Sequence, residues 1–203
     1  MAVVTASANA QSPADIHRPW ADTTGVLRAF GKQISEESKG RALLDPEISE
    51  SGTPSKLASP QRQWRERLTR IAGDVDGITL LPPLPAVMTL LERLCIDDYL
   101  RSHGTVYAIR SLAIVGDSAR LGYSTFRILS RADSGSFAWG GTDAWFVVRR
   151  MPYDFFIPMR KTNEWRVVER GVELYQDGFL NERQPPGYIG RSPSKPEDCI
   201  GAK

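Results

Sequence analysis

The fold is decided by residues 106–130, which read VYAIRSLAIVGDSARLGYSTFRILS. Residues 106–115 are mostly apolar or β-branched, and residues 121–130 are again rich in apolar, aromatic and β-branched side chains. Such residues favour strands, whereas the Gly-Asp-Ser sequence at 116–118 is typical of a turn. This stretch therefore predicts a β-hairpin.

Two further strands follow the hairpin. Residues 137–159 form a long aromatic and β-branched run that contains Gly140-Gly141, and residues 164–176 form another run after a polar turn. Glycines within strands mark bulges and bends. Together with a short apolar run at residues 77–81, the pattern predicts a strongly curved, mostly antiparallel sheet of four to six strands.

Helical periodicity precedes the hairpin. The spacing of apolar residues predicts helices at residues 23–38, at 60–72 and from 85 to 95. Helices that are segregated from an antiparallel sheet make an α+β fold. We expect three N-terminal helices packed on the curved sheet. They would close its open side, so that the sheet encloses a cone that is either packed solid or hollow.

The polar and proline-rich stretches predict one domain with two tails. We place the domain at residues 20–182, with a flexible loop at residues 45–60 that is full of Gly, Pro and Ser. Residues 1–19 are small and polar, and residues 183–203 are rich in proline. Both tails are expected to be disordered.

Charge and hydropathy disfavour two classes of partner. The 203 residues include 26 basic and 24 acidic ones, and the net charge of +2 is spread evenly along the chain. Without a concentrated basic segment, nucleic-acid binding is not expected. No apolar run approaches the ~20 residues of a membrane span, and the start lacks the regions of a signal peptide. We therefore expect a cytoplasmic protein without a membrane partner.

The cysteines and histidines are few. Cys95 lies in an apolar helical pattern and Cys199 in the polar tail, which favours one buried and one exposed thiol, although a disulfide between them stays open. His17 and His103 are the only histidines, and no Cys/His spacing suits zinc. We predict neither a metal nor a cofactor.

Three motifs resemble the SnoaL-like branch of the nuclear-transport-factor-2-like superfamily. The first is Arg-Ser-His at residues 101–103, followed by a strand that reaches Ile-Val-Gly-Asp-Ser-Ala at residues 114–119. The second is Gly-Gly-Thr-Asp at residues 140–143 with the strand after it, which resembles the family's penultimate strand. The third is Asn-Glu-Trp-Arg-Val-Val-Glu-Arg at residues 163–170, which resembles its terminal strand. The resemblance covers roughly residues 84–177.

This resemblance implies a cone-shaped α+β barrel with an apolar pocket. Members of the family include polyketide cyclases, isomerases, dehydratases and non-catalytic proteins, and several need no cofactor. Catalytic members usually pair the strand histidine with an aspartate on the first helix. Here that helix offers Glu36 and Glu37, with Asp22 just before it, and lacks the family's motif.

His103 and Asp143 are the candidate catalytic residues. An imidazole takes and gives protons near neutral pH, so His103 at the start of a strand would serve as base or acid. The alternative is a hydrogen-bonded histidine in a turn. Asp143 would orient the imidazole of His103, or it is an ordinary turn aspartate.

Four more residues are candidates for ligand binding. Tyr107 and Tyr123 offer phenol groups to a ligand, or they are core aromatics. Arg170 interrupts an apolar alternation, so on an interior face it needs a carboxylate partner or an anionic ligand, and on an exterior face it is an ordinary surface arginine. Trp145 belongs to a dense aromatic span that forms either core or an exposed surface for a homodimer; the span comprises Trp139, Trp145, Phe146, Tyr153, Phe155 and Phe156.

Two functions follow from these residues. The first is a cofactor-independent cyclase, isomerase or dehydratase that uses His103 on a hydrophobic small molecule. It requires the His103 ring to face an enclosed pocket of roughly a few hundred Å³, with a carboxylate in reach. The second is a non-catalytic binding or assembly module, which an interior filled by aromatic side chains would support.

Overall fold

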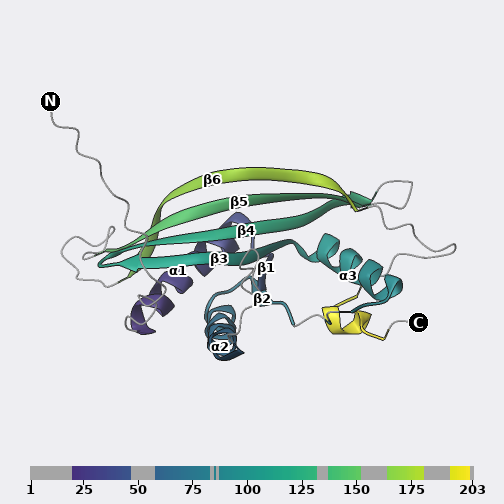
Figure 1. The fold of residues 1–203 in the computed structure, drawn as a ribbon, viewed down its shortest axis with the longest axis horizontal. Coiled ribbons are helices and arrows are strands. Elements are labelled where there is room, and N and C mark those ends of the chain that lie inside the picture. The colour runs from purple at the N-terminus through teal and green to yellow at the C-terminus, as the bar shows by residue number, and fades with distance from the viewer. Residues whose placement is uncertain are drawn as a thin grey trace.

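The structure is a computed structural model that describes residues 20–46, 58–82, 85, 87–131, 137–151, 164–180 and 193–201. The elements in chain order are α1 (Trp20–Glu37), β1 (Ala42–Asp45), α2 (Ala58–Asp74), β2 (Ile78–Leu80), α3 (Leu90–His103), β3 (Thr105–Val115), β4 (Ser118–Arg131), β5 (Phe137–Arg150), β6 (Trp165–Leu180) and the 3-10 helix η2 (Pro196–Cys199) (Figure 1). These elements confirm an α+β fold with three α-helices and one six-stranded sheet.

The sheet has the order β2-β1-β3-β4-β5-β6. The pairs from β3 to β6 are antiparallel, and β1 runs parallel to both β2 and β3. The predicted hairpin is confirmed as β3 and β4, which pair Val115 with Ser118 and Tyr107 with Thr125. A register shift at Arg110 marks a bulge in β3.

Strand β1 is absent from the sequence prediction. It contains only four residues, too few to show a period, and it ends at Asp45, where the pattern predicts a loop. Its first three residues are buried. Side chains that alternate between the two faces of a strand can all be buried only when both faces are covered.

The helices cover both faces of the sheet, and they are not all N-terminal. Leu44 and Tyr123 belong to a first core cluster with Phe30 of α1 and Leu68 of α2. The second core cluster joins the other faces of the same two strands to α3. It contains Leu43, Ile128, Leu94 and Tyr99, and the partly buried Phe126 packs against it. In Figure 1, α3 and η2 lie together at one end of the sheet, away from α1 and α2. The expected arrangement of three N-terminal helices that close one side is therefore wrong.

Helix α3 begins later than the pattern predicts, because its cap lies at Thr89. The Thr89 hydroxyl accepts from the Glu92 backbone N–H at 3.2 Å, and Glu92 Oε2 accepts from the Thr89 N–H at 2.7 Å. This reciprocal capping box satisfies two free backbone donors. The helix ends before Gly104, which has a φ of 141° and whose added Cβ would meet the backbone oxygen of Arg41. His103 therefore ends a helix instead of opening a strand.

The C-terminal residues 193–201 are anchored to α3. A disulfide joins Cys95 to Cys199 with their Cα atoms 5.4 Å apart, and both residues are buried. The expected pair of free thiols, one buried and one exposed, is therefore wrong. Residues 193–201 fall within the predicted tail and contain η2, whereas residues 1–19, 47–57 and 183–192 lie outside the described residues.

No helix in the described ranges is long and apolar enough to cross a membrane.

Candidate functional site

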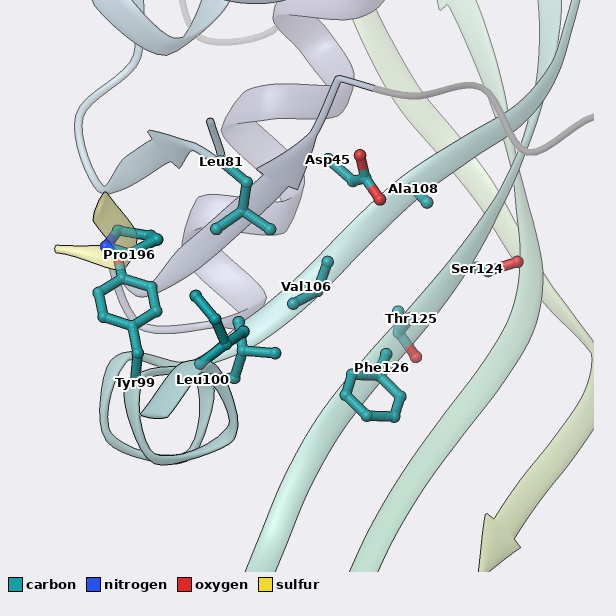
Figure 2. Close-up of a pocket in the computed structure, with 11 residues that line it drawn as sticks. Asp45, Leu81, Tyr99, Leu100, Val106, Ala108, Ser124, Thr125, Phe126 and Pro196 are labelled. Atoms are coloured by element: carbon teal, nitrogen blue, oxygen red, sulfur yellow. The ribbon is translucent and has the colours of Figure 1, made fainter. Parts of the chain in front are cut away.

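A cavity of about 270 Å³ lies between α3, the sheet and η2 (Figure 2). We call it the apolar cavity. Most of its wall consists of apolar side chains from α3, from β3 and β4, and from the residue after β2; these include Leu81, Ile96, Tyr99, Leu100, Val106 and Phe126. Pro196 of η2 completes the wall beside Tyr99. Ligand pockets in proteins have this character, mostly apolar with a few placed polar groups.

The polar groups of the cavity gather at one end. Asp45, Ser124 and Thr125 line it on the side away from α3 and Pro196 (Figure 2). Asp45 pairs with Ala108, and Ala108 pairs with Ser124, so these residues form one row across the sheet. The parallel pairing of β1 with β3 therefore brings the Asp45 carboxylate to the cavity.

Asp143 of β5 continues this row beside Ser124, one strand farther from Asp45. It pairs with Ser124, whose hydroxyl donates to Asp143 Oδ1 at 2.7 Å. Arg110 Nη1 lies 3.4 Å from Asp143 Oδ2, and Arg110 Nη2 donates to Glu173 at 3.0 Å. A serine hydroxyl has one hydrogen, so Ser124 oxygen is left to accept from a ligand. Both Asp45 and Ser124 thus present acceptors to the cavity.

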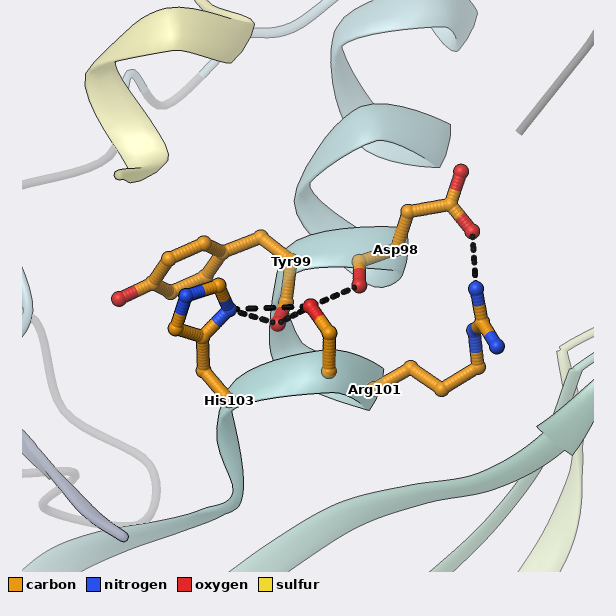
Figure 3. A network of polar contacts seen from close by, with 5 residues as sticks. Asp98, Tyr99, Arg101 and His103 are labelled. Atoms are coloured by element: carbon orange, nitrogen blue, oxygen red, sulfur yellow. Dashed lines mark hydrogen bonds and ion pairs between the residues drawn. The ribbon is translucent and has the colours of Figure 1, made fainter. Parts of the chain in front are cut away.

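His103 is held at the end of α3 (Figure 3). Its Nδ1 lies 2.9 Å from the Tyr99 carbonyl oxygen and 3.0 Å from Ser102 Oγ. Its ring stacks on the Tyr99 ring at a centroid distance of 4.0 Å. A ring nitrogen that faces a carbonyl oxygen carries the hydrogen. In the described part of the chain, no carboxylate lies within hydrogen-bonding distance of this ring.

The structure does not bring His103 and Asp143 together. Asp143 contacts Ser124 and Arg110, whereas the imidazole of His103 contacts Tyr99 and Ser102. His103 is not part of the cavity lining, although its stacking partner Tyr99 is. The predicted catalytic pair therefore has no shared geometry in this structure.

Tyr107 and Tyr123 are aromatic core residues beneath α1. Tyr123 stacks on Phe146 at 4.8 Å and lies 5.6 Å from Phe30, measured between ring centroids. Burial, with a smaller contribution from Glu37, raises the pKa of Tyr107 to about 12, and burial raises the pKa of Tyr123 as well. Both side chains belong to the first core cluster and neither lines the apolar cavity. The sequence left two interpretations, ligand-binding phenols or core aromatics, and the packing of both tyrosines matches core aromatics.

Trp145 and Arg170 also lie outside the cavity. The Trp145 ring occupies the space over Gly171, where an added Cβ would meet it, and the Arg120 guanidinium lies 4.6 Å from its centroid. Arg170 is exposed, as a surface arginine is, and its Nη1 donates to Glu37 Oε1 of α1 at 3.1 Å. In the aromatic span, Phe146 is fully buried, and Tyr153, Phe155 and Phe156 lie outside the described residues.

A second hollow, of about 510 Å³, lies farther along β3 to β6. Its wall mixes polar and apolar surface and includes Thr105, Arg127, Leu129, Tyr175 and Asp177. None of the six candidate catalytic and ligand-binding residues predicted from the sequence lines it. Among the described residues, no group of three or more His, Cys, Asp or Glu side chains is placed to hold a metal ion.

No family model, no curated protein and no solved structure matches this chain. The resemblance to the nuclear-transport-factor-2-like superfamily therefore stays a prediction.

Proposed function

We propose that this protein binds a small apolar molecule that carries a hydrogen-bond-donating end, and that the preferred ligand is an amine. The observation that carries this proposal is the apolar cavity, whose polar end presents the Asp45 carboxylate and the Ser124 hydroxyl. Apolar walls favour an apolar ligand body through the hydrophobic effect. The acceptors at one end favour a donor on that body.

Charge distinguishes an amine from an alcohol in this cavity. Two carboxylates lie near the polar end: Asp45 lines the cavity itself, and Asp143 lies beside Ser124 and is ion-paired with Arg110. A hydrogen bond to a charged group contributes about 1.5–3 kcal/mol, against about 1 kcal/mol for a neutral one. An ammonium group facing Asp45 therefore gains more than a hydroxyl group, and a carboxylate ligand is repelled.

Binding without catalysis is supported by the position of His103. The acid–base reaction predicted from the sequence needs the imidazole to face the pocket with a carboxylate beside it. His103 instead stacks on Tyr99 with its Nδ1 engaged by a backbone carbonyl. The cyclase, isomerase or dehydratase activity is left as a prediction without supporting geometry, and so is the homodimer. The proposal concerns the binding module alone.

The test uses three probes with the same apolar body, namely 2-phenylethylamine, 2-phenylethanol and 3-phenylpropionate. We expect calorimetric titration to give the tightest binding for the amine, by about tenfold over the alcohol, and none for the carboxylate. Asp45→Asn should bring the affinities for amine and alcohol together. Loss of the preference for the amine over the alcohol would identify Asp45 as the residue that binds the ammonium group of the ligand.

Filling the cavity provides the structural control. Ala108→Leu on β3 adds a side chain inside the cavity and should abolish binding of all the probes. Ala113→Leu makes the same change on the same strand at an exposed position and should leave binding intact. The proposal is wrong if no probe binds the wild-type protein, or if Ala108→Leu binds the amine as tightly as Ala113→Leu.

A further inference from the structure

The C-terminal segment, residues 193–201, forms part of the apolar cavity. Pro196, the first residue of η2, is buried and lies in the cavity wall beside Tyr99 (Figure 2). Cys199 is fully buried and bonded to Cys95 on α3, 104 residues earlier in the chain. Tyr99 lies one helical turn after Cys95, so the disulfide holds Pro196 against the helix that lines the cavity.

In the described part of the chain, the segment packs the buried Pro196 and Cys199 on the side of α3 and makes one hydrogen bond to that helix. The Gly201 backbone N–H donates to Glu92 Oε1 at 2.7 Å. The other hydrogen bonds among the described residues of the segment, and the ion pair of Lys195 with Asp198, are internal to it. It adds no strand to the sheet. Single turns of 3-10 helix have poor hydrogen-bond geometry and gain little stability alone. The disulfide is therefore the covalent tether that supplements this packing.

We propose that the C-terminal segment is a redox-dependent lid on the apolar cavity. With the disulfide formed, Pro196 walls the cavity; with the disulfide cleaved, the segment leaves and the side next to Tyr99 opens. Cleavage transfers two electrons and two protons from a dithiol reductant, which becomes a disulfide while Cys95 and Cys199 become thiols. The lid's effect on ligand exchange rests on the binding function proposed above, whereas its release does not.

Hydrogen–deuterium exchange measures the release without any ligand. The oxidised protein, the protein treated with dithiothreitol and the double variant Cys95→Ser/Cys199→Ser are compared by mass spectrometry. We expect peptides from residues 193–201 to exchange at least about tenfold faster in the second and third samples. Peptides from β4 and β5 should stay unchanged, which shows that the sheet remains folded. Unchanged protection of residues 193–201 in the reduced protein would overturn the lid.

Ligand exchange then connects the lid to the cavity. The dissociation rate of 2-phenylethylamine, measured by nuclear magnetic resonance, should rise on reduction. An equal rate in the two redox states would overturn the link to the cavity. If no probe binds in either state, the binding function fails, and the exchange data still decide whether the segment is released.

If reduction also unfolds the sheet, a second variant tests the lid while the disulfide stays intact. Pro196→Gly removes the side chain from the cavity wall and keeps the disulfide. We expect faster dissociation of the amine from this oxidised variant, with normal exchange in β4 and β5. A dissociation rate equal to that of the wild type would show that Pro196 is not part of a lid.

Discussion

Individual residues of the candidate site act through short chains of contacts. Ser124 lines the apolar cavity and donates to Asp143, which in turn is paired with Arg110. Asp143 was predicted as the partner of an imidazole, and it instead fixes the hydroxyl hydrogen of Ser124. His103 touches the cavity only through the ring of Tyr99. Asp143 and His103 thus each have a polar partner, but the two residues do not form the pair that the sequence predicted.

The buried Tyr107 makes stability depend on pH. Its pKa of about 12 in the folded protein exceeds its ordinary value of 10, chiefly because of burial. The stabilisation is therefore fully present below pH 10 and is lost as the pH rises toward 12. From these values, the unfolding free energy should fall by about 1 kcal/mol between pH 9 and pH 11 through Tyr107 alone.

Urea unfolding at pH 9, 10 and 11 checks this effect. Tyr107→Phe should show a smaller fall than the wild type over that range, because phenylalanine has no proton to lose. Tyr175→Phe provides the control, since the Tyr175 side chain is 76% exposed. An identical fall in the wild type and in Tyr107→Phe would contradict the assignment.

Among the elements, α3 connects most of the features of the site. Its N-terminus is set by Thr89, its middle carries Cys95, and its last turns carry Tyr99 and His103. The sequence predicts a helix in this region because its leucines are spaced helically. It does not predict the start, because Pro85 is also a good first helical residue and competes with the capping box at Thr89.

Loss of the capping box should destabilise α3. Thr89→Ala removes the acceptor for the Glu92 N–H, and we expect a loss of about 1 kcal/mol in the free energy of unfolding. Thr69→Ala is the matched control, because Thr69 lies exposed inside α2, where alanine is the better helix former. Equal stability of the two variants, measured by urea unfolding, would argue against the cap.

At the scale of the whole molecule, the sheet joins two core clusters on opposite faces. Leu43 and Leu44 are neighbours in β1, yet they belong to different clusters. Strands β3 and β4 likewise contribute to both. Because the two clusters share these strands, neither face can lose its packing without disturbing the other.

This sharing predicts one cooperative unfolding transition. Leu44→Ala removes a fully buried side chain from the first cluster, and we expect a loss of about 2–5 kcal/mol. Tryptophan fluorescence and binding of 2-phenylethylamine should be lost at the same urea concentration in the variant, as in the wild type. Separate midpoints for the two signals would show that the clusters unfold independently.

The predicted hairpin, the α+β class and the approximate positions of the helices follow from local patterns that the sequence contains. Strand propensity, turn residues and helical spacing act between near neighbours, so they can be read along the chain. The departures are β1, the start of α3 and the ordered residues 193–201. The first is too short to show a period, the second depends on competing start signals, and the third depends on a bond across 104 residues.

The sequence by itself determined which side chains were available for a site: many carboxylates and aromatics, but two histidines and two cysteines. Only the tertiary structure decided which of them meet. Asp45 and Ser124 line the same cavity because β1 pairs in parallel with β3, and Cys199 bonds to Cys95 because the C-terminal segment returns to α3. Both arrangements depend on strand register and on contacts between distant parts of the chain, and no local sequence pattern encodes these.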